Sequence, residues 1–63
     1  MSQYLSQIPA LAESTEILIS AMCNSPHANE GKIQEITDQS HLALAKMADY
    51  AKYLDERNEQ LQE

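Results

Sequence analysis

The sequence predicts an all-α protein, an antiparallel two-helix hairpin that forms a homodimeric four-helix bundle or a coiled-coil-like assembly. Apolar residues recur at alternating intervals of three and four in two long segments, which is the spacing of an amphipathic helix. Residues typical of turns gather between these segments, at positions 24–31. The chain has no Phe, Trp or Val, whereas Ala, Leu, Glu and Gln, which favour helices, are abundant. We therefore expect a single helical-hairpin domain over residues 1–63.

The first helix is expected over about residues 7–23. Its apolar seam has the heptad spacing of a helix that packs along another helix, and it consists of Tyr4, Ile8, Leu11, Thr15, Leu18 and Met22. The row of residues that flanks this seam is formed by Leu5, Ala12 and Ile19. Because proline is tolerated only in the first turn of a helix, Pro9 places the start near Gln7 and makes Ser6 the expected N-cap.

The turn is expected over about residues 24–29, and the second helix over about residues 30–61. A start at Ser25 and Pro26 is an alternative, since these residues suit a cap and a first helical position. We favour the later start because apolar periodicity resumes only at Ile33. The seam of this helix consists of Ile33, Ile36, Ser40, Ala43, Met47, Tyr50, Leu54, Arg57 and Leu61, and Leu44 and Ala51 widen it on one side.

The two seams match when the chain folds back on itself. Folding places Met22 near Ile33 and keeps the register constant to within one residue as far as Tyr4. The same register sets the hydroxyls of Thr15 and Ser40 opposite each other in the middle of the hairpin. Such a polar layer can fix the register, or each hydroxyl can bond the backbone of its own helix four residues earlier.

A single hairpin of this length leaves apolar surface uncovered. A chain of about 60 residues buries only about 60% of the surface that its unfolded form exposes, so its stability is marginal without help. Residues 17–19 are all apolar and extend far around the first helix, and the second helix outruns the first. We therefore expect a homodimer that also binds another protein, with an interchain contact formed by Ile17, Ile19, Met47, Tyr50, Tyr53, Leu54 and Leu61.

The charge of the chain argues against several other partners. The formal net charge is −6, and the four Lys and Arg side chains lie among carboxylates, whereas nucleic-acid binders carry clustered basic residues. The longest apolar run, residues 17–19, is far shorter than the roughly 20 residues that span a bilayer. The first residues lack the basic segment of a secretory signal, and a single cysteine suits a reducing compartment. We expect a cytoplasmic protein that binds no nucleic acid, membrane or small-molecule substrate.

No residue pattern indicates catalysis, a cofactor or a metal. Cys23 and His27 are four residues apart near the turn, but a structural zinc site needs about four ligands, so we expect a buried thiol and an exposed histidine. His41 lies three residues after Asp38, within reach of it on one helix, and we expect a surface histidine. The acidic residues, Asp55 among them, are expected on solvated outer faces. The sequence therefore predicts a protein that is not an enzyme.

The missing chemistry and the surplus apolar surface favour a binding role. We expect a small acidic regulator or inhibitor of another protein, or an adaptor, that acts through a helical dimer surface. Proteins of this size and charge are common among bacterial and phage regulators, which is an analogy and not a motif. The alternative is a secretion-type co-chaperone or structural subunit that folds only with its partner. A third reading, an RNA-binding helical dimer, lacks the basic face that it would need.

Overall fold

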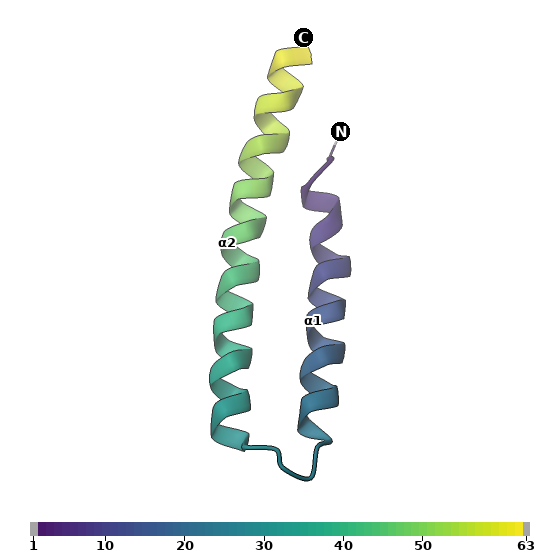
Figure 1. Ribbon diagram of the computed structural model, residues 1–63. Helices are drawn as coiled ribbons and strands as arrows, with labels where there is room; N and C mark the ends of the chain where they lie inside the picture. The colour runs from purple at the N-terminus through teal and green to yellow at the C-terminus, as the bar shows by residue number, and fades with distance from the viewer. Residues whose placement is uncertain (1, 63) are drawn as a thin grey trace.

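The chain folds as an extended hairpin of two antiparallel helices (Figure 1). The computed structural model describes residues 2–62, and the Cα atoms span 55 × 16 × 8 Å. A short 3-10 helix, η1 (Leu5–Gln7), leads into α1 (Ile8–Cys23), and α2 (Glu30–Gln62) runs back beside both. The prediction of an all-α hairpin is thereby confirmed. Neither helix in this part of the chain is long and apolar enough to cross a membrane.

The start of the chain is held by Asp55 of α2. Its Oδ1 atom accepts hydrogen bonds from the backbone N–H groups of Gln3, at 3.0 Å, and Tyr4, at 2.9 Å. Its Oδ2 atom accepts from the N–H of Leu5 at 2.9 Å and from the hydroxyl of Ser2 at 3.1 Å. The first N–H groups of a helical segment have no partner within the helix, so a carboxylate at this point acts as an N-cap. Here the cap comes from the other helix, and it fixes the N-terminus against α2.

Two predictions about this region are wrong. Asp55 does not lie on a solvated outer face, because only 6% of its surface is exposed. Ser6 does not cap α1, because its Oγ atom donates to the carbonyl oxygen of Ser2 at 3.3 Å and Gln7, at the N-cap position, has no side-chain cap. A carboxylate supplied by α2 takes over the capping role that we assigned to a local hydroxyl.

The contacts of Asp55 predict a pH-dependent start of the hairpin. Burial raises the pKa of this carboxyl, but the N–H groups of Leu5, Tyr4 and Gln3 and the hydroxyl of Ser2 together lower it below the ordinary value of 3.8. A depressed pKa stabilises the folded state above pH 3.8, and this stabilisation is lost as the pH falls through the lower, folded-state value. We therefore expect the N-terminal residues to detach from α2 as the pH falls below 3.8 and through the depressed pKa of Asp55.

The substitution Asp55→Asn tests this contact at neutral pH. An amide presents one acceptor oxygen and places N–H groups against donors, so residues 2–5 should be released and the melting temperature should fall by several degrees. Amide hydrogen exchange at Gln3, Tyr4 and Leu5, followed by NMR, should become much faster. The matched control is Glu56→Gln, which removes the neighbouring exposed acid. Equal exchange rates in both variants would show that Asp55 does not cap the N-terminus.

The turn is organised by two polar side chains. Ser25 Oγ accepts from the N–H of His27 at 3.2 Å, and the N–H of Ala28 donates to the carbonyl oxygen of Ser25 at 3.1 Å. Asn29 Oδ1 accepts from the N–H of Lys32 at 3.0 Å, which is the bond of an N-cap three residues into a helix. This cap accounts for the start of α2 at Glu30 and not at Ser25 and Pro26.

The seam between the helices is rotated from the predicted one by one row. The side chains of α1 that are half-buried or buried are Ile8, Ala12, Thr15, Ile19 and Met22. Those of α2 are Ile33, Thr37, Ser40, Leu44, Ala48, Ala51, Leu54, Asp55 and Asn58. The seam prediction is wrong for the residues that are exposed instead, which are Tyr4, Leu11, Leu18, Ile36, Ala43, Met47, Tyr50, Arg57 and Leu61. Ala12 and Ile19, which were predicted to flank the seam, lie in it beside Ile8 and Met22.

Small side chains at three positions of the seam are compatible with close packing of the helices. Ala12 of α1 and Ala48 and Ala51 of α2 lie in the observed seam. Small residues allow the axes of two helices to approach closely, whereas a larger side chain pointing directly at the neighbouring helix would hold the axes apart. Thr15 and Ser40 remain in the seam, as predicted, and Thr15 Oγ1 donates to the carbonyl oxygen of Leu11 at 2.9 Å. Thr15 thus bonds its own helix.

Candidate functional site

One broad surface of the hairpin is apolar and open to solvent, and we call it the apolar face. Its residues form three rows with a seven-residue period, so each row keeps to one side of its helix. One row lies on the side of η1 and α1 and consists of Tyr4, Leu11 and Leu18. Two rows lie on α2: the first is Ile36, Ala43 and Tyr50, and the second is Met47, Leu54 and Leu61. Most of the residues predicted for the seam therefore lie here, on a surface that the hairpin itself does not cover.

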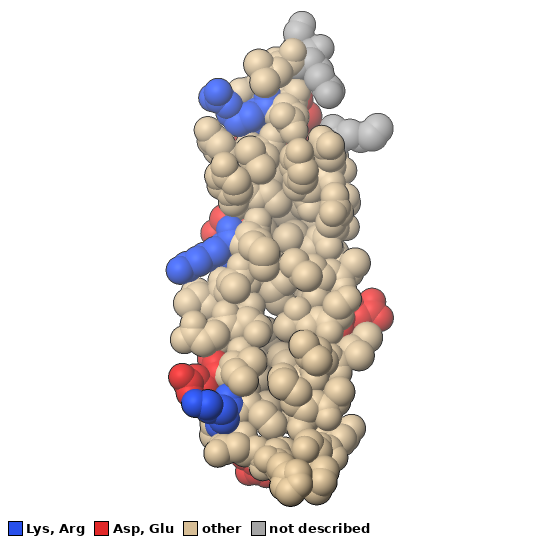
Figure 2. All heavy atoms as spheres, viewed as in Figure 1, with Lys and Arg blue, Asp and Glu red and all other residues tan. Residues whose placement is uncertain are grey.

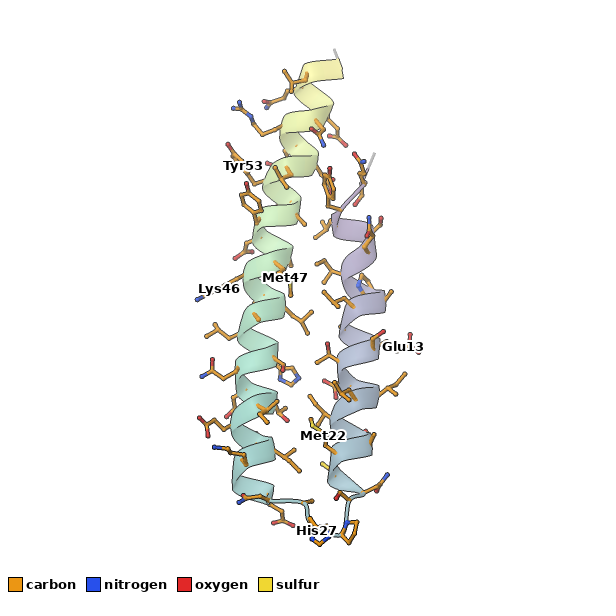
Figure 3. All side chains as sticks on the ribbon, viewed as in Figure 1. Glu13, Met22, His27, Lys46, Met47 and Tyr53 are labelled. Carbon is orange, nitrogen blue, oxygen red and sulfur yellow. The ribbon has the colours of Figure 1, made fainter. Side chains whose placement is uncertain are left out.

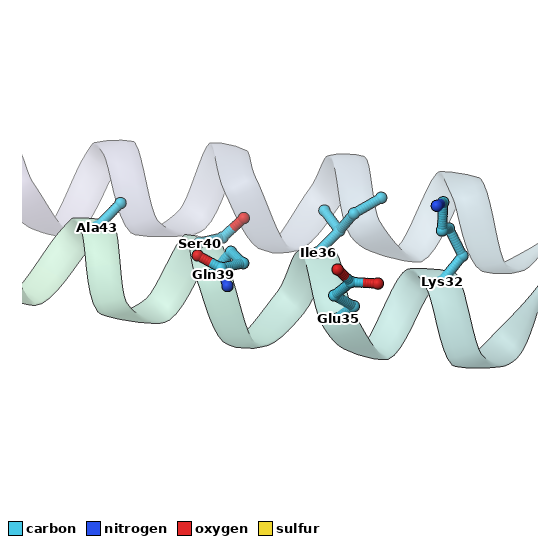
Figure 4. A pocket seen from close by; sticks show the side chains of 6 residues that line it. All are labelled: Lys32, Glu35, Ile36, Gln39, Ser40 and Ala43. Atoms are coloured by element: carbon cyan, nitrogen blue, oxygen red, sulfur yellow. The ribbon is translucent and has the colours of Figure 1, made fainter.

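Two shallow hollows lie along this face, and one of them joins residues of the three rows. The first brings both helices together and is lined by Tyr4, Gln7, Ile8, Leu11, Met47, Tyr50, Ala51 and Leu54. The second lies nearer the turn and is lined by Lys32, Glu35, Ile36, Gln39, Ser40 and Ala43 (Figure 4). Ile36 and Ala43 project from α2 in this close-up, with charged and amide groups beside them. Hollows between apolar side chains can accept the side chains of an opposing helix.

Charged groups lie at the edges of the apolar face. Figure 2 shows this side of the molecule: basic and acidic groups lie together along the α2 edge, an acidic group lies on the α1 edge, and uncharged side chains cover the middle. In the same view, Lys46 points away from α1 and Glu13 points away from α2, whereas Met47 lies between the helices (Figure 3). An uncharged centre with a charged rim is the usual make-up of a protein interface.

The opposite face is polar. His41 of α2 and Glu16 of α1 approach to 2.8 Å between Nε2 and Oε1, and Gln34 donates to Asp38 at 2.9 Å. His41 is a surface histidine, as expected, and its partner is Glu16 across the hairpin, whereas Asp38 pairs with Gln34. Cys23 is exposed, which contradicts the predicted buried thiol, and it lines a hollow with Ile19, Ile33, Gln34 and Thr37. The two faces of the hairpin thus differ sharply in polarity.

The residues predicted for an interchain contact fall into three groups. Met47, Tyr50, Leu54 and Leu61 lie on the apolar face, where Leu61 is 80% exposed and Leu54 is half-buried beside Tyr4. Ile19 is only 9% exposed and belongs to the hairpin's own core, so we leave it out of the proposed contact.

Ile17 and Tyr53 form the remaining group, on the outer sides of the two helices. Ile17 is 63% exposed and lies two residues from both Thr15 and Ile19, about 200° around the helix from the seam. Tyr53 points outward from α2 (Figure 3) and stacks on Tyr50, with the ring centroids 5.9 Å apart. The guanidinium carbon of Arg57 lies 5.9 Å from the centroid of the Tyr53 ring. Neither residue faces the middle of the apolar face.

The described residues show an exposed apolar surface without a metal-binding cluster. Residues 2–62 contain no group of three or more His, Cys, Asp or Glu side chains placed to hold a metal ion. The hollows are open, shallow and lined mainly by aliphatic, amide and hydroxyl groups. The position of the apolar face is not evident from the sequence, because the heptad pattern that marks it also fits an intrachain seam.

Comparison with models of protein families, with curated proteins and with solved structures gave no match for this chain.

Proposed function

We propose that the chain is a protein-interaction module that works as a homodimer, as a regulator, inhibitor or adaptor of another protein. The observation that supports this proposal is the apolar face, which carries large exposed side chains from both helices and no charge at its centre. Monomeric soluble proteins rarely leave a continuous apolar surface of this kind in water. In the proposed dimer, two such faces pack together and complete a four-helix bundle.

The free energy available from covering this face is large compared with the stability of a small hairpin. Burying one Leu, Ile or Met side chain contributes roughly 1.5–3 kcal/mol. Leu11, Leu18 and Leu61 alone are 42%, 61% and 80% exposed in the single hairpin. Small domains are stable by only about 5–15 kcal/mol, and chains as short as this one lie at or below the lower end. Folding and self-association are therefore expected to be coupled.

A second surface remains for the protein that is regulated. Ile17 on the outer side of α1, and Leu42 and Tyr53 on α2, are exposed and lie away from the centre of the apolar face. Packing of two apolar faces would leave these side chains in solvent. The net charge of −6 favours a partner with a basic surface, since opposite charge steers two proteins together.

Static light scattering on the purified chain tests the proposal. We expect a mass of twice the 7.1 kDa of one chain at concentrations of tens of micromolar, together with the circular dichroism spectrum of a helical protein. An unfolded or aggregating chain would favour the alternative, a co-chaperone or structural subunit that folds only with its partner. A folded monomer would contradict both.

A further inference from the structure

We propose that the second hairpin packs on the apolar face with both turns at the same end of the bundle. This inference rests on the proposed homodimer and specifies how its two copies are arranged. The twofold axis then runs parallel to the helices, and α1 of each chain packs on α2 of the partner. The other symmetric arrangement turns the partner end over end, so that α1 packs on α1, α2 packs on α2, and the turns lie at opposite ends.

The distribution of charge along the edges favours turns at the same end. Glu16 contacts His41, and Leu11 lines a hollow with Met47, so Glu13 lies at the height of residues 41–47 of α2. Lys46 lies at this height on the other edge of the face (Figure 3). A twofold axis parallel to the helices exchanges the two edges. It therefore brings Glu13 to the same edge and height as the partner's Lys46, twice in each dimer.

The end-over-end arrangement brings like charges together. Because α1 then packs on α1, an axis through the middle of the hairpin places Glu13 near the partner's Glu13. Lys46 lies close to this middle level, so it approaches the partner's Lys46 on the other edge. Like charges that face each other across an interface disfavour that pairing, so the positions of Glu13 and Lys46 favour turns at the same end.

The unequal lengths of the helices favour the same arrangement. The contacts of Asp55 with residues 2–5 mark the end of the hairpin overlap, so α2 continues beyond it for about two turns. Leu61, in this extension, is 80% exposed. With the turns at one end, both extensions leave the bundle at the other end, where Leu61 can pack against the partner's Leu61. In the opposite arrangement, Leu61 would approach the partner's turn, residues 24–29, which are exposed and mostly polar.

The size of the face is sufficient for a stable dimer. The Cα atoms extend 55 Å along the helices and 16 Å across them. A face of these dimensions is comparable with the roughly 800 Å² that each partner buries in a standard protein interface. Charged residues lie at its edges and leave the centre free to pack.

The arrangement also creates a composite surface on each side of the dimer. Ile17 lies on the outer edge of α1, one residue after Glu16, which contacts His41. The twofold axis exchanges the two edges, so the partner's Leu42 comes to the same edge as Ile17. Measured along the bundle, the two side chains lie within about one helical turn of each other. Each side of the bundle then carries an apolar patch to which both copies contribute.

Spin labels on Cys23 distinguish the two arrangements. Cys23 is exposed, is the only cysteine of the chain and lies at the turn end of α1, outside the apolar face. From a helix spacing of 8–10 Å and a rise of 1.5 Å per residue, we expect about 25 Å between two labels when the turns lie at the same end. We expect about 40 Å or more when they lie at opposite ends.

Pulsed electron–electron double resonance on the labelled full chain measures this distance. A main population near 25 Å would support the arrangement, and one at 40 Å or beyond would overturn it while leaving the homodimer intact. Absence of a dipolar signal at tens of micromolar would mean that the proposed homodimer itself fails. Dilution with an excess of unlabelled chain is the control, because it must abolish a signal that arises between two copies.

Discussion

Replacing Leu18 with glutamate is expected to convert the dimer into a monomer. Leu18 is 61% exposed in the hairpin, so its loss costs the single chain little, but it lies in a row of the apolar face with Leu11 and Tyr4. The substitution removes a side chain whose burial in the dimer contributes roughly 1.5–3 kcal/mol of free energy, and a twofold dimer contains this change twice. We therefore expect Kd to rise at least about 100-fold, since each 1.4 kcal/mol corresponds to a factor of ten.

The matched control is Ile17→Glu. Ile17 is adjacent in sequence, is 63% exposed and has similar size and polarity, but it lies on the outer side of α1. We expect this variant to remain a dimer, with Kd changed less than about tenfold, in sedimentation equilibrium at several concentrations. If both variants dissociated equally, or if only Ile17→Glu did, the apolar face would not be the surface that two copies share.

Truncation of Ile19 is expected to unfold most of the protein. Ile19 is 9% exposed and is the most buried side chain of α1, in the seam against α2. Replacement of a buried isoleucine by alanine costs about 2–5 kcal/mol, because apolar contacts are lost and a cavity remains. A chain of 63 residues has little more stability than this, so Ile19→Ala should lose most of its helical signal near 25 °C.

Ile17→Ala supplies the comparison for Ile19→Ala. It removes the same atoms from a position two residues earlier, where the side chain is in solvent. Its thermal melt, followed by circular dichroism, should stay close to that of the unmodified chain, because surface substitutions change stability by only about 0.5 kcal/mol. Equal losses in the two variants would place the seam elsewhere on α1.

The hairpin could be predicted from the sequence because its signals are local. Turn-forming residues cluster between two helical patterns, Pro9 limits the start of α1, and Asn29 provides a cap for α2. Each of these signals acts within a few residues, so no knowledge of the tertiary contacts was needed.

The identity of the seam could not be predicted in the same way. Each helix carries two adjacent apolar rows with the same seven-residue period, so periodicity defines a broad stripe but not the row that faces the neighbouring helix. Helices that pack in a four-helix bundle need both rows, one for the intrachain neighbour and one for the remaining helices. Small residues occur in both rows, Ala12 and Ala51 in the seam and Ala43 on the apolar face, so residue size does not separate the rows either.

Sequence patterns also do not predict the polar contacts between residues that are far apart in the chain. Asp55 is about 50 residues from the N–H groups that it caps, and nothing around it in the sequence differs from a surface carboxylate. The same holds for Glu16 and His41, which lie 25 residues apart. Such partners become evident only when the register and rotation of both helices are known.

The central claim is that a second copy of the chain covers the apolar face, and a dilution series on the unmodified protein tests it most directly. We predict that sedimentation equilibrium gives twice the 7.1 kDa chain mass at high concentration, and that the mass and the melting temperature both fall on dilution, because the folded unit is the dimer. A chain that keeps the mass of a monomer at every concentration, and melts cooperatively at a temperature independent of concentration, would contradict this account.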